Sequence, residues 1–122
     1  MSKVKVVDKK VSMGLSQLIK YQIMTYCFIE KFQLSEADLN CLTLLGAKGH
    51  SDITDFCNLA AVEHVFKTPQ TVRNCIVKLE KMKLVTRDLS KKVISLSPAM
   101  QIQTLGNIVL DYKLYHLDTK TS

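Results

Sequence analysis

The residues best suited to chemistry in this sequence are the cations gathered between residues 67 and 92. This stretch carries a net charge of +6, which equals the charge of the whole chain, so the remainder is neutral on balance. Its cations are Lys67, Arg73, Lys78, Lys81, Lys83, Arg87, Lys91 and Lys92, opposed by Glu80 and Asp88. An even spread of charge would serve solubility, whereas concentration in one stretch favours a polyanionic partner.

Side chains able to read nucleobases lie within the same stretch. Gln70 and Asn74 can each form two hydrogen bonds with adenine, and Arg73 can do the same with guanine. Cations suited to phosphates follow at Lys78 and Lys81, and cations suited to the backbone or the minor groove follow at Arg87, Lys91 and Lys92. Together these residue types predict contact with base edges and with phosphates.

A helix and a hairpin are the elements expected to position these side chains. Thr68 is a good N-cap and Pro69 suits the first helical position, so a helix is expected from there to about Met82. Its apolar stripe is Val72, Cys75, Ile76 and Leu79. Two β-prone runs around a short polar turn then predict a hairpin over 84–96.

Apolar spacing predicts four further helices around this pair. The expected ranges are 12–32, 35–46, 54–66 and 98–117, with Ser35 and Thr54 as N-caps. Residues 1–10 alternate lysine and valine, which fits either a short strand or a basic arm. The apolar surface of 12–32 and 98–117 exceeds what one small domain can cover, which predicts a symmetric homodimer built from these two helices.

This order of elements predicts one domain over 1–122, mainly α with a small β-hairpin. The class is a winged helix-turn-helix with its core at 34–96 and long N- and C-terminal dimerisation helices. The second helix of such a motif enters the major groove of double-stranded DNA by its N-terminal end. The candidate DNA-binding residues are therefore Thr68, Pro69, Gln70, Thr71, Arg73, Asn74, Lys78, Lys81, Arg87, Lys91 and Lys92.

Three segments resemble the MarR-type winged helix-turn-helix regulators. Residues 68–85 (TPQTVRNCIVKLEKMKLV) are similar to that family's recognition helix and its exit, residues 91–98 (KKVISLSP) to its return strand, and residues 34–45 to the preceding helix. The resemblance implies an obligate dimer, joined by the first and last helices, on pseudo-palindromic DNA. Lys83 stands where the family usually has glycine, and the wing is short.

The cysteines and histidines show no ligand pattern. Cys27, Cys41, Cys57 and Cys75 lie among apolar neighbours, so we interpret them as reduced, buried hydrophobes in a reducing, cytoplasmic setting. Cys75, with cations nearby in sequence, is the candidate if one thiol senses oxidants. His50, His64 and His116 have no metal-ligand spacing, so neither metal nor cofactor is expected.

Other functional classes find less support in the residues. No catalytic triad, phosphate loop or pair of carboxylates at motif spacing is recognisable, so an enzyme is not expected. No apolar run is long enough for a membrane span. Two alternatives stay open: a winged helix that docks on transcription or replication machinery, and a sensor that leaves DNA on binding a small-molecule effector or on cysteine oxidation.

Overall fold

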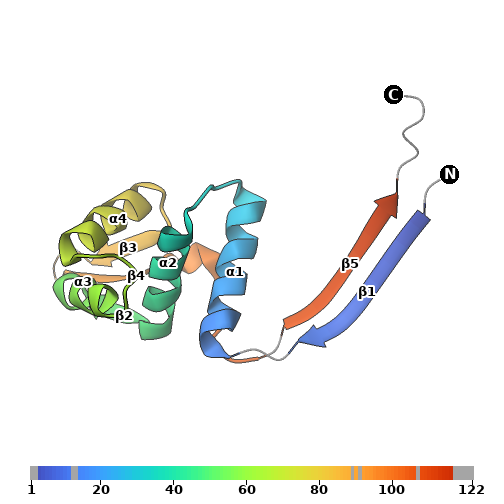
Figure 1. The fold of residues 1–122 in the computed structure, drawn as a ribbon, viewed down its shortest axis with the longest axis horizontal. Coiled ribbons are helices and arrows are strands. Elements are labelled where there is room, and N and C mark those ends of the chain that lie inside the picture. The colour runs from blue at the N-terminus through green and yellow to red at the C-terminus, as the bar shows by residue number, and fades with distance from the viewer. Residues whose placement is uncertain (1–2, 12–13, 89, 91, 107, 117–122) are drawn as a thin grey trace, which may run out of the picture.

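The computed structural model describes residues 3–11, 14–88, 90, 92–106 and 108–116. Its helices are α1 (Leu15–Glu30), α2 (Glu36–Lys48), α3 (Ile53–Val62), α4 (Pro69–Lys81) and the short 3-10 helix η1 (Pro98–Met100). Its strands are β1 (Lys3–Val11), β2 (His50–Asp52), β3 (Val85–Asp88), β4 (Val93–Leu96) and β5 (Ile108–His116). Figure 1 shows a body of helices over a small sheet, with a separate ribbon of β1 and β5. Within the described residues, no helix is long and apolar enough to cross a membrane.

The body is built on a three-stranded antiparallel sheet in the order β2-β4-β3. The predicted hairpin is confirmed as β3 and β4, which pair from Val85↔Leu96 to Asp88↔Val93. Strand β2 was not predicted, because three residues are too few to show a pattern and only the pairing with β4 defines them. The core beneath the helices includes the fully buried Phe56 and Ile76.

Helix α2 begins at the predicted cap but runs further than expected. The Ser35 side chain accepts a hydrogen bond from the Asp38 amide, and the Asp38 carboxylate accepts one from the Ser35 amide, which completes a capping box. Gly46 lies inside the helix rather than at its end. A Cβ there would stand 2.8 Å from Ile19 and 2.9 Å from Leu96, so glycine permits the close packing of α2 against α1 and β4.

Helices α3 and α4 form a helix-turn-helix. The predicted N-cap Thr54 is wrong, because Asp52 Oδ1 accepts from the amides of Thr54 and Asp55. Helix α3 also ends four residues early, at Val62, where His64 turns into the left-handed region at φ 61°. Helix α4 begins as predicted, with Thr68 as N-cap and Pro69 in its first turn.

The long helix predicted over 98–117 is wrong. Of the described residues in this range, only those of η1 are helical, and two hydrogen bonds between the Gln22 side chain and the Gln103 backbone then hold the chain against α1. Residues 108–116 form β5, whose apolar residues fit both a helical stripe and a strand, and pairing with β1 decides between them. The helix predicted over 12–32 is present as α1, so the pair of long terminal helices is not seen.

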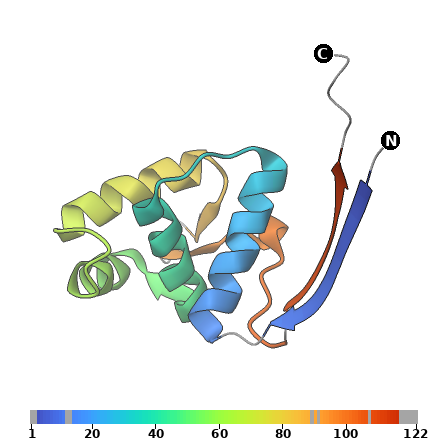
Figure 2. The ribbon, with the colours of Figure 1, turned by 45° about the vertical axis from the view of Figure 1, so that its right-hand side comes forward.

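The sequence allowed either a short strand or a basic arm over residues 1–10, and in the structure Lys3–Val11 form strand β1. The two strands pair antiparallel without a break from Lys3↔His116 to Val11↔Ile108. The ribbon stands apart from the body in both ribbon views (Figure 2). The ribbon is thus an addition to the helix-turn-helix body rather than part of its core.

Candidate nucleic-acid interface

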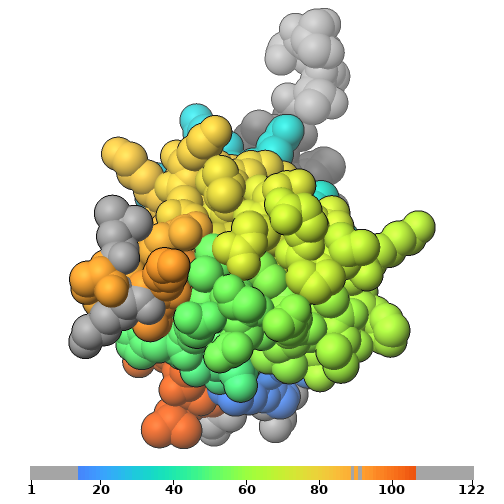
Figure 3. Space-filling view, turned by 90° about the vertical axis from the view of Figure 1, so that its left-hand side faces the viewer, coloured from blue at the N-terminus to red at the C-terminus, as the bar shows by residue number. Residues whose placement is uncertain are grey.

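Helix α4 divides cleanly into a buried and a solvent-facing side. The predicted stripe of Val72, Cys75, Ile76 and Leu79 is buried in the core. Gln70, Thr71 and Asn74, from the first turns, are exposed. Figure 3 looks onto this face, where α3 (green), α4 (yellow-green) and the β3–β4 hairpin (yellow to orange) form one continuous surface.

The first two turns of α4 hold their polar side chains in an ordered set. Thr68 Oγ1 accepts from the Thr71 amide and lies 2.6 Å from Thr71 Oγ1. Gln70 Nε2 donates to Asn74 Oδ1 over 3.0 Å, one helical turn away. This bond leaves the side-chain NH2 group of Asn74 and the side-chain carbonyl of Gln70 available as donor and acceptor groups.

Arg73 joins the two helices of the motif. Its Nη2 donates to Thr54 Oγ1, in the first turn of α3, over 3.3 Å. The side chain is half-buried, unlike those of Gln70 and Asn74. One single hydrogen bond to a neutral hydroxyl leaves most of the five guanidinium donors free to meet another acceptor.

Lys78 lies against a buried carboxylate rather than open solvent alone. Its Nζ is 2.5 Å from Asp38 Oδ2, where the Asp38 side chain is only 5% exposed and that of Lys78 is 54% exposed. Cys75 Sγ donates to the other Asp38 oxygen over 3.2 Å. The pair ties α4 to the first turn of α2, a role that the sequence reading missed because the two residues are forty positions apart.

The Asp38–Lys78 contact shifts both ionisations. Burial of Asp38 favours its neutral form, but hydrogen bonds from Lys78, Cys75 and Ser35 outweigh burial and lower the carboxyl pKa. The same contact raises the pKa of the Lys78 ammonium. Both groups are therefore charged at neutral pH, and part of the positive charge counted in the sequence is neutralised locally.

The predicted cations of the hairpin and the end of α4 fall into two groups. Arg87, on β3, forms an ion pair with Glu80 near the end of α4, and both side chains are half-buried. Lys81 and Lys92 are exposed, and Lys92 adopts φ 54° in the turn before β4. Lys91 lies outside the described residues. The exposed Lys67 and Lys83 flank α4 at its two ends.

All four cysteines are buried and unpaired. Burial raises the thiol pKa of Cys27 and Cys57. A hydrogen bond with Cys41 and burial, with Asp38 adding to both, raise that of Cys75 strongly. A reactive thiol needs the opposite shift, so the geometry at Cys75 agrees with a packing role.

The described residues contain no group of three or more His, Cys, Asp or Glu side chains that could hold a metal ion.

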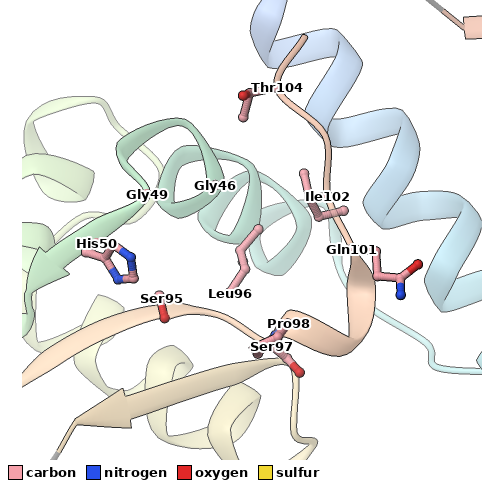
Figure 4. A pocket seen from close by; sticks show the side chains of 10 residues that line it. All are labelled: Gly46, Gly49, His50, Ser95, Leu96, Ser97, Pro98, Gln101, Ile102 and Thr104. Atoms are coloured by element: carbon pink, nitrogen blue, oxygen red, sulfur yellow. The ribbon is translucent and has the colours of Figure 1, made fainter. Parts of the chain in front are cut away.

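A shallow hollow lies where the end of α2 meets β4 and the chain after η1 (Figure 4). His50 and Ser95 line it from the two paired strands, and Leu96 and Ile102 supply apolar walls. It is lined by none of the residues of α4.

Comparison with known proteins gives one structural likeness. No protein-family model and no curated protein matches the chain. A solved structure of a zinc uptake regulator complexed with zinc and DNA matches with a TM-score of 0.57 and 20% identity, over 69% of this chain and 57% of that one. The chain spans little more than half the length of that regulator. The likeness confirms the winged helix-turn-helix fold, whereas membership of the MarR-type family finds no support.

Proposed function

We propose that this protein is a transcriptional regulator that binds double-stranded DNA, with α4 in the major groove and the β3–β4 wing on the backbone or the minor groove. The observation that carries the proposal is the exposed, ordered set Gln70, Thr71 and Asn74 on the leading turns of α4, whose other face is fixed in the core. A helix presented in this way places side chains at base edges. The structural neighbour is a regulator complexed with DNA, which supports DNA as the partner.

Within the predicted interface, we assign base reading and phosphate contact to different residues. Gln70, Asn74 and Arg73 are proposed to read bases, and Arg73 reaches DNA with a guanidinium that Thr54 orients. Thr68, Pro69 and Thr71 shape the leading turn. Exposed Lys81 and Lys92, with Lys91, supply phosphate contacts. Lys78 and Arg87 already have carboxylate partners, so we expect them to contribute less to DNA affinity than to the position of α4.

We further propose a symmetric homodimer, which would place two copies of α4 on the two halves of a pseudo-palindromic site. Helix α1 supports self-association, because Met24, Phe28 and Ile29 are exposed, Phe28 at 86%. Four unpaired thiols agree with a reducing, intracellular setting.

Selection of bound duplexes from a random DNA pool tests the proposal. An enriched inverted repeat would support both base reading and two-fold symmetry. Binding of all sequences alike, abolished by moderate salt, would reduce the protein to a backbone binder. No binding even at low salt would contradict DNA recognition and favour a winged helix that docks on another protein.

A further inference from the structure

The β1–β5 ribbon is an incomplete sheet. Among the residues that the structure describes, each of its nine-residue strands pairs only with the other, so each keeps one edge of unpaired amides and carbonyls. An isolated two-stranded ribbon is at best marginally stable in water, and a long open edge is a template for another strand. The length and regularity of the ribbon therefore call for a further strand on one edge.

The register inside the ribbon places like charges opposite each other at its centre. Asp8 pairs with Asp111, and Lys113, two positions along β5, faces the uncharged Val6. Directly opposed like charges destabilise an antiparallel pair. Lys10 and Lys113 occupy register positions two residues from this pair and offset part of the repulsion, but neither stands directly opposite an aspartate. A cation directly opposite Asp111 on the open edge of β5 would offset it further.

Strand β5 is self-complementary when a second copy runs antiparallel to it about Tyr112. In that register Asp111 meets Lys113 of the partner subunit, and the reciprocal pair forms by symmetry. Leu110 then meets Leu114 and Val109 meets Tyr115 of the partner subunit, while the two Tyr112 residues meet on the axis. Opposite charges, aliphatic pairs and aromatic pairs are the combinations that stabilise antiparallel strands.

Other arrangements lose these matches. A shift of the axis to residue 111 or 113 opposes two aspartates or two lysines. Strand β1 centred on Val7 opposes Lys5 and Lys9, and lysines on an open edge discourage pairing. The favourable edge is therefore that of β5.

We propose that two copies of this chain join through their β5 edges into a continuous antiparallel sheet of the order β1-β5-β5-β1, with a two-fold axis at Tyr112. This inference rests on the homodimer of the proposed function and places its contact at the β5 edge rather than at the exposed side chains of α1. The isologous contact needs no partner other than a second copy.

Charge reversal on the full chain tests the β5 contact. Asp111→Lys and Lys113→Asp each place like charges at two symmetric positions, so each variant should weaken the dimer about tenfold or more in sedimentation equilibrium. Asp111→Lys also removes the repulsion with Asp8, so its loss of dimer cannot come from a weaker ribbon. An equimolar mixture of the two variants restores both opposite-charge pairs and should form a heterodimer. Variants that dimerise as well alone as mixed would overturn the proposal.

A cysteine on the proposed axis gives a second, independent measurement. Tyr112→Cys should form a covalent dimer under mild oxidation, whereas Val7→Cys, at the same register position on β1, should not. The native thiols are buried and do not compete. Equal cross-linking of both variants, or none in either, would contradict the β5 contact.

DNA binding measured on the same preparations separates this inference from the proposed function. If the charge and cysteine variants behave as expected but the protein binds no DNA, the β5 contact is supported and the proposed regulator function is contradicted. If the protein binds DNA sequence-specifically and both single charge reversals still dimerise, the regulator function is supported and the β5 contact is contradicted.

Discussion

At the scale of single residues, the same side-chain type serves two purposes on α4. Lys78 and Lys81 are one turn apart, and both look like phosphate contacts in the sequence. The structure gives Lys78 a buried carboxylate partner and leaves Lys81 exposed. Removing Lys78 is costly because the buried Asp38 carboxylate then lacks its charged partner.

We therefore expect Lys78→Gln to lower the free energy of unfolding by about 1–2 kcal/mol, since Asp38 loses a charge-assisted hydrogen bond. Lys81→Gln, the matched control, should change it by less than about 0.5 kcal/mol. Urea unfolding of both variants checks this. Equal stability of the two would show that the Asp38 contact contributes nothing.

The ion pair also predicts how stability depends on pH. The pKa of Asp38 is lowered below 3.8 in the folded state, so its contribution is present above that value and is lost as the pH falls through the folded pKa. The pKa of Lys78 is raised above 10.5, so its contribution is present below that value and is lost as the pH rises through the folded pKa. In Lys78→Gln, the loss of stability at low pH should be smaller and should occur closer to the ordinary pKa of an aspartate. Measuring unfolding at a series of pH values checks this.

Base reading is argued for Asn74, which is exposed and paired with Gln70. Asn74→Ala should cost about 1–3 kcal/mol on the selected site and relax the preference at one base position, with the fold unchanged. Competition between the selected site and single-base variants measures both effects. Full affinity and unchanged preference in a folded Asn74→Ala protein would count against α4 as the reading helix.

At the scale of elements, the exit of α4 has the hydrogen bonds of a Schellman motif with lysine in place of glycine. Lys83 has φ 63°, its amide donates to the Glu80 carbonyl, and the Leu84 amide donates to that of Leu79. The sequence showed this departure from the glycine common in such exits. The left-handed backbone of Lys83 turns the chain from α4 toward β3, and Leu84, which follows it, is fully buried.

Lys83→Gly should accordingly raise the free energy of unfolding by about 1 kcal/mol, because glycine adopts a positive φ without a steric penalty. Lys81→Gly, at the last residue of α4, should instead lower it, by up to about 1 kcal/mol. Opposite shifts of the two urea midpoints would confirm the motif. A loss of stability in both variants would mean that the Lys83 side chain makes a contribution larger than its strain.

The wing is an element whose expected contribution is affinity rather than sequence preference. Lys92→Ala should weaken binding to all duplexes alike and reduce the slope of log affinity against log salt by about one. Lys31→Ala, another left-handed lysine, at the end of α1, should leave the slope unchanged. A change of base preference in Lys92→Ala would instead assign the wing to base reading.

At the scale of the whole molecule, the body and the ribbon are separable. The buried core side chains lie between Leu18 and Met100 among the residues whose burial the structure describes. A chain of residues 14–106 lacks both ribbon strands but keeps this core. We expect it to unfold cooperatively, within a few degrees of the full chain, and to sediment as a monomer.

The same shortened chain should bind a half-site like the full protein but lose affinity for the inverted repeat, because the second contact is no longer tethered. Titration of both duplexes measures the difference. Retention of the dimer in residues 14–106 would assign association to α1 rather than to the ribbon.

The features that could be predicted from the order of residue types are those whose signals are local. Thr68 and Pro69 set the start of α4, Ser35 set that of α2, the apolar stripe set the buried side of α4, and two β-prone runs around a polar turn set the wing. Each of these features depends on residues that lie within a turn or two of one another. Local hydrogen bonding and apolar periodicity can therefore be predicted directly from the order of residue types.

The features that need a distant partner became apparent only in the folded chain. Residues 108–116 have apolar spacing compatible with helix or strand, and pairing with Lys3–Val11 at the other end of the chain makes them a strand. His50–Asp52 are a strand only beside β4, and Lys78 has a structural role only beside Asp38. Strand propensity and ion pairing are properties of the surroundings, so such choices follow from what the fold brings together.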